Sequence, residues 1–377
     1  MALLSEEHEA LRKMVREFAQ KEIAPRAAHY DHTEEFPWDN VQQMAKLGLI
    51  GLPIPEKYDG AETDMLSYAI AVEEISKACA ATGVIMATNV SASLPVLLFG
   101  TEEQRLKYLP PLARGEKMGA FALTEPNAGS DASRVTTTAT LDGNEYVITG
   151  TKCFITNGSA AETFNIFASV DKSKGIKGIT AFIVEKGTPG LSIGKKEEKM
   201  GIRASSTTEV VLENCRIPKE NLVGKEGEGF KIAMTVLDSG RIGISAQALG
   251  IAQRAFEEAV LYAKQREQFG KPVSAFQAIS FMLADMAIQI EAARQLVYHA
   301  AMLKDAGLPF GKEAAIAKTF ASDTANKVAT DAVQIMGGYG YSREYPAERL
   351  MRDAKITQIY EGTNQIQRVV IAGHILK

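Results

Sequence analysis

The spacing of apolar residues divides the chain into three stretches with different periods. Over residues 1–116, apolar positions recur every three or four residues, which predicts helices. Over 117–229 they alternate in short runs bounded by glycine, proline and lysine, which is typical of strands. Over 230–377 the helical spacing returns in longer runs. We therefore expect a mainly α protein with a β-domain: an N-terminal helical domain, a middle β-barrel or sandwich, and a C-terminal four-helix bundle.

Prolines and capping residues set the helix boundaries expected in the first stretch. The segments Leu66–Ala81 and Ala87–Phe99 are apolar enough to be buried helices, and Pro95 is expected to interrupt the second. Thr101 is a suitable cap for another helix, because two glutamates and a glutamine follow it. That helix is expected to stop at the pair Pro110-Pro111.

A hairpin is the clearest signal of the middle stretch. The dipeptide Asp142-Gly143 separates two alternating runs, Val135–Thr140 and Tyr146–Thr149, and this dipeptide favours a tight two-residue turn. Further short strands are expected at Ile179–Glu185, Leu191–Gly194 and Thr208–Leu212.

Three long apolar seams indicate the bundle, over residues 244–262, 279–300 and 317–335. A shorter final helix carries Ile366, Val369 and Val370. The third seam consists of Ala317, Phe320, Ala321, Thr324, Val328, Ala332 and Ile335.

Composition narrows the class of protein. Of the 377 residues, 46% are hydrophobic and 23% charged, and the formal net charge is −4. This balance suits a globular protein and argues against a nucleic-acid partner. Cys79, Cys153 and Cys215 are too widely spaced for a metal or disulfide pattern, so we expect reduced thiols and no metal site.

No apolar run approaches the roughly 20 residues of a membrane span, and the first ten residues lack a secretory signal pattern. We therefore expect no membrane association and a reducing compartment. A bacterial cytoplasm fits this expectation, and so does the mitochondrial matrix for a processed organellar protein.

A carboxylate near the end of the chain stands between an aromatic residue and a glycine. In the run Tyr360-Glu361-Gly362, the glycine would let the backbone approach a ligand, which suits a base at the mouth of a pocket. The alternative is a helix-entry loop capped by Thr363 or Asn364, with Glu361 solvated beside it.

Two polar segments of the β-domain could hold a planar or phosphorylated ligand. Phe121–Asp131 is a strand followed by a loop rich in hydroxyl, amide and glycine, although an ordinary turn would look similar. In Lys152–Gly158, Phe154 and Thr156 are expected on one face of a strand. The chain contains neither a P-loop nor a strand-borne G-x-G-x-x-G, and Gly224–Gly229 is expected to be a mobile connection.

Five motifs together resemble one family. LTEPNAGSD, KCFITNG, QREQFGKPVSAFQAI, QIMGGYGYSREYPAERLMRDAKI and IYEGTNQIQR are similar to the signatures of the acyl-CoA dehydrogenases, in the same order over essentially the whole chain. The resemblance implies that family's three-domain fold, tightly bound FAD and a homotetramer built as a dimer of dimers. It is strongest to the short-chain, butyryl-type enzymes of fatty acid β-oxidation.

The resemblance also implies FAD contacts within the β-domain. Thr124 and Ser130 would touch the flavin and its pyrophosphate, with Leu123 behind the ring. Phe154 would cover the flavin where most relatives have tryptophan, and Thr156 would bond near N5.

Other FAD contacts implied by the resemblance lie in the bundle. Arg266, Phe269 and Gln277 resemble residues that a neighbouring subunit lends to the ADP half of FAD. Gln334, Gly337 and Gly338 resemble the glycine turn that meets the other end of the ADP half. Thr363 and Gln365 resemble the final contacts on the adenine side.

For the substrate, the resemblance implies an acyl-CoA whose CoA portion is bound by Asp238 and Arg241. Glu361 would remove the α-proton, while its backbone N–H and a flavin ribityl hydroxyl bond the thioester oxygen. The β-hydride would pass to flavin N5 and the electrons to electron-transferring flavoprotein. Some relatives carry the base at the position of Gly240, where glycine cannot serve. The further substrate contacts are Ser130, Tyr360 and Gly362.

Several alternatives remain open. The segment Ile85–Pro95 corresponds to the pocket floor and contains no arginine, which argues against a glutaryl-type substrate. Gly240 and Gln247–Gly250 suit a short straight or branched acyl chain, and a cyclic acyl-CoA is also compatible. A DNA-associated flavoprotein of the superfamily would be expected to be basic. An acyl-CoA oxidase would be expected to carry a long extension beyond the position of Lys377.

Overall fold

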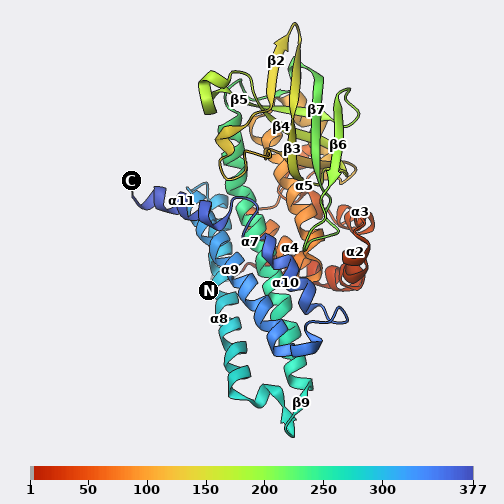
Figure 1. Cartoon of the computed structure of the whole chain (residues 1–377), viewed down its shortest axis with the longest axis vertical. Helices are drawn as coiled ribbons and strands as arrows, with labels where there is room; N and C mark the ends of the chain where they lie inside the picture. Colours follow the sequence, from red (N-terminus) through yellow and green to blue (C-terminus); the bar gives the residue numbers. More distant parts are fainter. Residues whose placement is uncertain (1–3, 377) are drawn as a thin grey trace.

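A computed structural model describes residues 4–376. The β-domain occupies one end, long helices extend to the other end, and a helical N-terminal part packs between them (Figure 1). The predicted fold class is confirmed. The N-terminal helices are α1 (Glu6–Phe18), α2 (Ala27–Thr33), α3 (Trp38–Lys46), α4 (Met65–Ala78), α5 (Ala80–Phe99) and α6 (Glu102–Ala113).

The prolines do not end the helices as predicted. Helix α5 runs without interruption through Pro95, and α6 continues through Pro110 and Pro111 to its last residue, Ala113. A proline within a helix costs about 3 kcal/mol, because it removes one donor and crowds one carbonyl. Most of α5 and one face of α6 are buried in the core, and this packing outweighs the cost of the prolines.

The prediction that no apolar run approaches membrane-spanning length is also wrong. Helix α5 has 20 residues and is apolar enough to cross a membrane by length and composition. However, 78% of its most apolar window is buried inside the protein, as is usual for a helix at the centre of a core.

The β-domain is an eight-stranded sheet with the order β6-β7-β3-β2-β4-β5-β8, and β1 pairs in parallel with β4. The predicted hairpin is confirmed, since Asp142 pairs with Glu145 across the turn. The sequence did not predict β4. The strands are β1 (Met118–Ala122), β2 (Thr138–Asp142), β3 (Glu145–Thr156), β4 (Ala161–Ser169), β5 (Ile179–Glu185), β6 (Leu191–Lys196), β7 (Thr207–Pro218) and β8 (Leu222–Val223).

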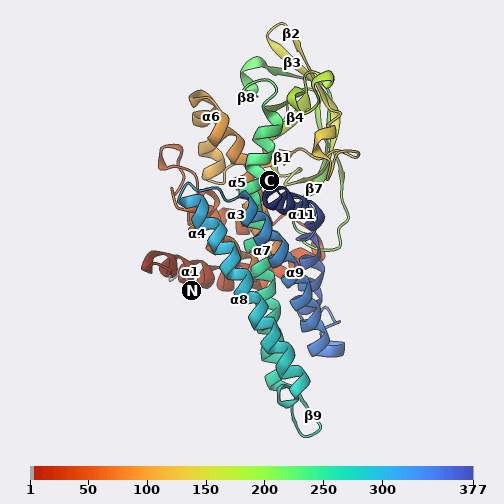
Figure 2. The ribbon, with the colours of Figure 1, turned by 90° about the vertical axis from the view of Figure 1, so that its left-hand side faces the viewer.

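Of the C-terminal helices, α7, α8 and α9 run side by side along the long axis (Figure 2), whereas α11 lies across it (Figure 1). The seam predicted for α9 needs one correction: Phe320 is 38% exposed, whereas Lys318, two positions earlier, is fully buried. Between α7 and α8 lies a small hairpin of β9 (Glu267–Gln268) and β10 (Lys271–Pro272). The helices are α7 (Gly229–Gln265), α8 (Gln277–Asp305), α9 (Gly311–Met336), α10 (Ala347–Ile356) and α11 (Asn364–Ile375).

Candidate active site and dinucleotide site

Glu361 lies in the turn between α10 and α11, in an uncommon backbone conformation. Its φ is +52° and that of Gly362 is +86°, so both residues are left-handed. Such a conformation is unfavourable for a residue with a side chain and persists where the surroundings impose it. The hydroxyl of Thr363 accepts from the Ile366 N–H at 3.3 Å and caps α11. Of the two expected caps, Thr363 is therefore the one used.

The Glu361 carboxylate is not the solvated group of the simpler interpretation. Burial raises its pKa to about 7, against the opposing charges of Arg241 and Lys318. Its Oε2 is buried and has no hydrogen-bond partner among residues 4–376. A carboxylate that has a buried, unpaired oxygen and a pKa near neutrality is suited to accept a proton.

Helix α7 faces this carboxylate with a glycine. A Cβ added to Gly240 would lie 2.7 Å from Glu361 Oε2, closer than real Cβ atoms approach another heavy atom. The next residue, Arg241, is buried and pairs with Asp238 one turn earlier, while its Nε has no partner within the described chain. One turn of α7 thus provides space, a cation and a half-buried acid.

Two more of the residues predicted to contact substrate, Tyr360 and Gly362, are held by the protein itself. The Tyr360 hydroxyl donates to Gln247 Oε1, and the Gln247 amide donates to Ala80 O at 2.9 Å. The Gly362 carbonyl accepts from Gln367 Nε2 at 2.9 Å. Tyr360 therefore offers its ring rather than its hydroxyl to a neighbouring molecule.

The two polar segments of the β-domain are joined directly, because the Cys153 N–H donates to Thr124 O at 3.0 Å. Phe154 has φ +56° and is 64% exposed, at a shift in the β3–β7 register between Lys152 and Ile155. The simple alternation predicted for this strand is therefore broken by a bulge, which turns the aromatic ring outward. Leu123 is buried, Thr124 and Thr156 are half-buried, and Ser130 is exposed.

A buried ion pair supports this surface. Lys152 Nζ donates to Glu125 Oε1 at 2.7 Å and to Leu123 O at 3.2 Å, and both side chains are almost fully buried. The other carboxylate oxygen accepts from the Thr136 N–H at 2.6 Å. The Lys152 charge and these bonds lower the Glu125 pKa to about 2, although burial opposes that shift.

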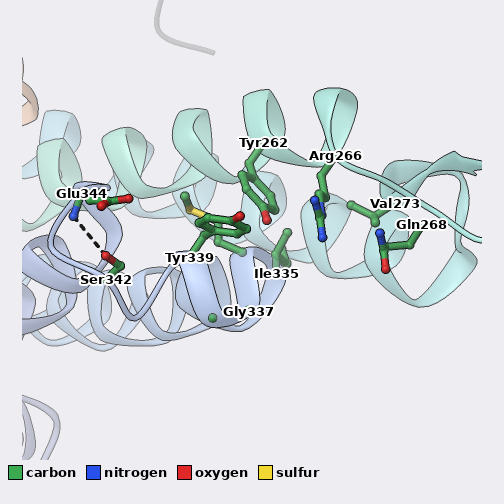
Figure 3. A pocket seen from close by; sticks show the side chains of 11 residues that line it. Tyr262, Arg266, Gln268, Val273, Ile335, Gly337, Tyr339, Ser342 and Glu344 are labelled. Carbon is green, nitrogen blue, oxygen red and sulfur yellow. Dashed lines mark hydrogen bonds between the residues drawn. The ribbon is translucent and has the colours of Figure 1, made fainter.

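A separate hollow of about 550 Å³ lies where α7 and α9 end (Figure 3). Arg266, Gly337 and Gly338 line it together with Tyr262 and Tyr339. Nothing lies within 4 Å of a Cβ added at either glycine, so the backbone there is open to a ligand. The other predicted contacts nearby are exposed: Phe269, Gln277 and Gln334.

The two predicted halves of the cofactor site do not meet within one chain. The hairpin beside Arg266 lies at the opposite end of the molecule from the β-domain that carries Phe154 (Figure 1). Gln365 is exposed on α11, which lies between these ends. One dinucleotide could contact both halves only if a second copy of the chain brought its α7–α9 end to the β-domain of the first.

Three family profiles match the chain: "Acyl-CoA dehydrogenase, N-terminal domain" at residues 5–116, "middle domain" at 120–215 and "C-terminal domain" at 227–376. The chain belongs to the acyl-CoA dehydrogenase family. It is 57% identical to a short-chain specific acyl-CoA dehydrogenase of Clostridium acetobutylicum, over 99% of both chains. It is also 52% identical to an acryloyl-CoA reductase (NADH) of Anaerotignum propionicum, over 99% of this chain and 95% of that protein.

Solved structures of the family match the whole fold. Butyryl-CoA dehydrogenase from Megasphaera elsdenii is 52% identical with a TM-score of 0.98, and each chain is covered completely. A chain from work on the electron transferring flavoprotein of Acidaminococcus fermentans is 55% identical with a TM-score of 0.99, again with both chains fully covered. An acyl-CoA dehydrogenase complexed with FAD from Bacillus anthracis is 38% identical with a TM-score of 0.93, covering 99% of this chain and 67% of that one.

Acyl-CoA dehydrogenases are FAD-dependent oxidoreductases, and the residues of this chain fit that cofactor. An outward aromatic ring and half-buried hydroxyls suit a flavin, while a guanidinium beside two open glycines suits a pyrophosphate. Among residues 4–376, no group of three or more histidine, cysteine, aspartate or glutamate side chains could hold a metal ion.

The sequence did not predict several residues of these sites. Lys318 and Gln367 are fully buried and donate to the turn that carries Glu361, and Tyr339 lines the hollow beside Arg266. The signal for Lys318 is a lysine directly beside the seam residue Ala317 within an alanine-rich helix. A buried lysine needs a partner, so its position indicates a polar site.

Proposed function

We propose that this chain catalyses the FAD-dependent α,β-dehydrogenation of a short-chain acyl-CoA to the trans-2-enoyl-CoA, with Glu361 as the base. The short-chain specific relative and the butyryl-CoA dehydrogenase structure support the substrate class. The single observation that carries the proposal is the Glu361 carboxylate, whose buried Oε2 has no partner among the described residues and whose pKa is about 7.

In the proposed reaction, a Glu361 carboxylate oxygen accepts the α-proton of the acyl group. The Glu361 N–H donates to no other group among the hydrogen bonds of residues 4–376, which leaves it available to the thioester oxygen. A donor placed there stabilises the negative charge that develops as the proton leaves. Asp238 and Arg241 bind the CoA portion, with Ser130, Tyr360 and Gly362 as further contacts.

FAD, when bound, supplies the acceptor for the β-hydride. We assign Leu123, Thr124, Ser130, Phe154 and Thr156 of one subunit to its flavin half. A neighbouring subunit would complete the site with Arg266, Phe269, Gln277, Gln334, Gly337 and Gly338, and the adenine-side contacts would be Thr363 and Gln365. The separation of the two groups along the molecule supports sharing between subunits.

The wider assignments follow from the same resemblance. We propose a homotetramer of three-domain subunits with boundaries at 1–116, 117–229 and 230–377. Electron-transferring flavoprotein is the proposed electron acceptor, supported by the 55% identical chain from work on such a flavoprotein. Bacterial relatives and a mitochondrial one from Mus musculus support a bacterial cytoplasm or a mitochondrial matrix.

A second candidate is the reverse reaction, the reduction of a short enoyl-CoA. The 52% identity to an acryloyl-CoA reductase over nearly the whole chain favours it. The same Glu361 would then return a proton to the α-carbon. Comparing the anaerobic rates of flavin reduction by butyryl-CoA and of flavin reoxidation by crotonyl-CoA and acryloyl-CoA distinguishes the two directions.

The proposal is tested by anaerobic titration of the purified protein with butyryl-CoA. We expect the flavin absorbance to bleach, and Glu361→Gln to keep the flavin spectrum but lose bleaching. Full bleaching by Glu361→Gln would remove this residue from the reaction. Titration with branched, cyclic, glutaryl and longer acyl-CoAs then identifies the preferred acyl group.

A further inference from the structure

The turn that carries Glu361 is held from behind by two buried side chains on different helices. Lys318 of α9 donates from Nζ to the Gly362 carbonyl at 2.8 Å. Gln367 of α11 donates from Nε2 to the Glu361 carbonyl at 3.0 Å and to the Gly362 carbonyl at 2.9 Å. Both side chains are fully buried. The carbonyl groups of the two left-handed residues, Glu361 and Gly362, are therefore held by hydrogen bonds inside the protein.

Lys318 is itself anchored. Its Nζ also donates to Asn364 Oδ1 at 3.0 Å, and the Asn364 amide donates to Ser322 Oγ at 2.9 Å and to Asp323 Oδ1 at 2.7 Å. Gln358 Nε2 donates to the same Asp323 oxygen at 2.6 Å. These hydrogen bonds connect α9 to Gln358 before the turn and to Asn364 after it, so Lys318 has little freedom to move away from Gly362.

We propose that Lys318 is a positioning residue for the base: it holds the left-handed Glu361–Gly362 turn and supplies a buried positive charge that favours the ionised form of Glu361. The inference rests on the proposed role of Glu361. Gln367 holds the same carbonyl without carrying a charge, so the two contributions can be separated by substitution.

The charges around the pair are consistent with this role. Burial lowers the Lys318 pKa to about 7, and the Glu361 carboxylate opposes that shift. The lysine in turn lowers the pKa of Glu361, after the larger effects of burial and Arg241. The charged and titratable groups that face the pair are Arg241 from α7, Asp323 from α9, Tyr68 from α4 and Tyr360 from the turn itself. Asp238 pairs with Arg241 and not with either member of the pair.

The test compares Lys318→Met with Gln367→Met in the full-length holoenzyme. Each variant loses a donor to Gly362 O, but only Lys318→Met also loses a charge. We expect both to slow anaerobic bleaching by butyryl-CoA at pH 8. Only Lys318→Met should move the acidic limb of the rate–pH profile to higher pH, by about one unit, which corresponds to about a tenfold slower rate on that limb.

Lys199→Met is the control for removing a lysine whose ammonium donates to a backbone carbonyl; Lys199 is half-buried and lies in the β-domain part of the chain. Lys199 Nζ donates to Ser205 O at 2.8 Å, and burial lowers its pKa to about 8. This control should leave the acidic limb in place, and flavin content and thermal unfolding show whether each variant is folded. Acidic limbs that coincide for Lys318→Met and wild type would overturn the inference.

If Lys318→Met does not fold, the test uses Lys318→Arg, which keeps the positive charge. This variant should keep the acidic limb of the rate–pH profile at the wild-type pH while its rate changes. A displaced limb in Lys318→Arg would also overturn the inference. If Glu361→Gln still bleaches fully, the proposed function fails instead, whatever Lys318 does.

Discussion

Gly240 and Glu361 face each other so closely that a Cβ at position 240 would lie 2.7 Å from the carboxylate oxygen Oε2. The glycine on α7 therefore provides the space in which the base stands. Its role is steric, because its φ is not in the left-handed region and another residue could adopt its backbone conformation.

Gly240→Ala should consequently displace the carboxylate while leaving the fold intact. A misplacement of about 1 Å can lower a catalytic rate by about a hundredfold, so we expect a loss of that order in anaerobic flavin reduction. Gly373→Ala is the control, because its added Cβ meets nothing within 4 Å on α11. A Gly240→Ala variant with an unchanged reduction rate would show that the carboxylate has room elsewhere.

The elevated Glu361 pKa predicts a pH dependence. Proton abstraction requires the carboxylate form, so the flavin reduction rate should fall as pH drops below about 7. The decrease should approach tenfold per pH unit once the group is mostly protonated. Stopped-flow reduction from pH 5.5 to 8.5 measures this limb, and a rate that stays constant down to pH 5.5 contradicts the assignment.

Arg266→Ala should weaken FAD retention without changing the fold. The guanidinium lines the hollow beside Gly337 and Gly338, where it is the group suited to a pyrophosphate. Equilibrium dialysis of the apoprotein with FAD should give at least a tenfold higher Kd. Arg216→Ala is the control, because Arg216 pairs with Asp142 and Glu145 on the β-domain surface. Equal affinity in both variants would exclude the hollow from the cofactor site.

Glu125→Gln should destabilise the β-domain, because it leaves the Lys152 ammonium buried without its counter-charge. Breaking a buried pair in this way typically costs about 3–5 kcal/mol, measurable as a lower midpoint in urea. Glu145→Gln on the surface of the same domain is the control and should leave the midpoint nearly unchanged. Equal midpoints in the two variants would contradict the role of the pair.

The Glu125 pair also predicts how stability depends on acid. The folded-state pKa is about 2, below the ordinary value of 4.5, so the native state favours the ionised form. That contribution is fully present above about pH 4.5 and is lost as pH falls from there towards 2. Unfolding midpoints measured from pH 6 to pH 3 should show a smaller acid loss in Glu125→Gln than in wild type.

Local sequence signals predicted the order of helical and β segments and the Asp142-Gly143 hairpin. They left Glu361 open between a base and a solvated loop residue, and its assignment as the base came from the family resemblance and stays a prediction. Local signals failed where packing dominates. Pro95, Pro110 and Pro111 lie inside helices whose burial outweighs the proline penalty. Apolar spacing predicted that Phe320 is buried, but this residue is 38% exposed. Lys318 is buried instead, because its ammonium donates to the buried Asn364 side chain. That contact joins residues 46 positions apart, and no periodicity reports it.

The distance between the Phe154 surface and the Arg266 hollow has a genetic consequence under the proposed sharing of FAD. Two defective alleles, one altered at Thr156 and the other at Arg266, would each yield a protein with an impaired FAD site. When co-expressed, a mixed pair would combine one intact flavin surface with one intact hollow. Partial complementation between such alleles, and its absence between two alleles altered on the same side, would distinguish shared sites from self-contained ones.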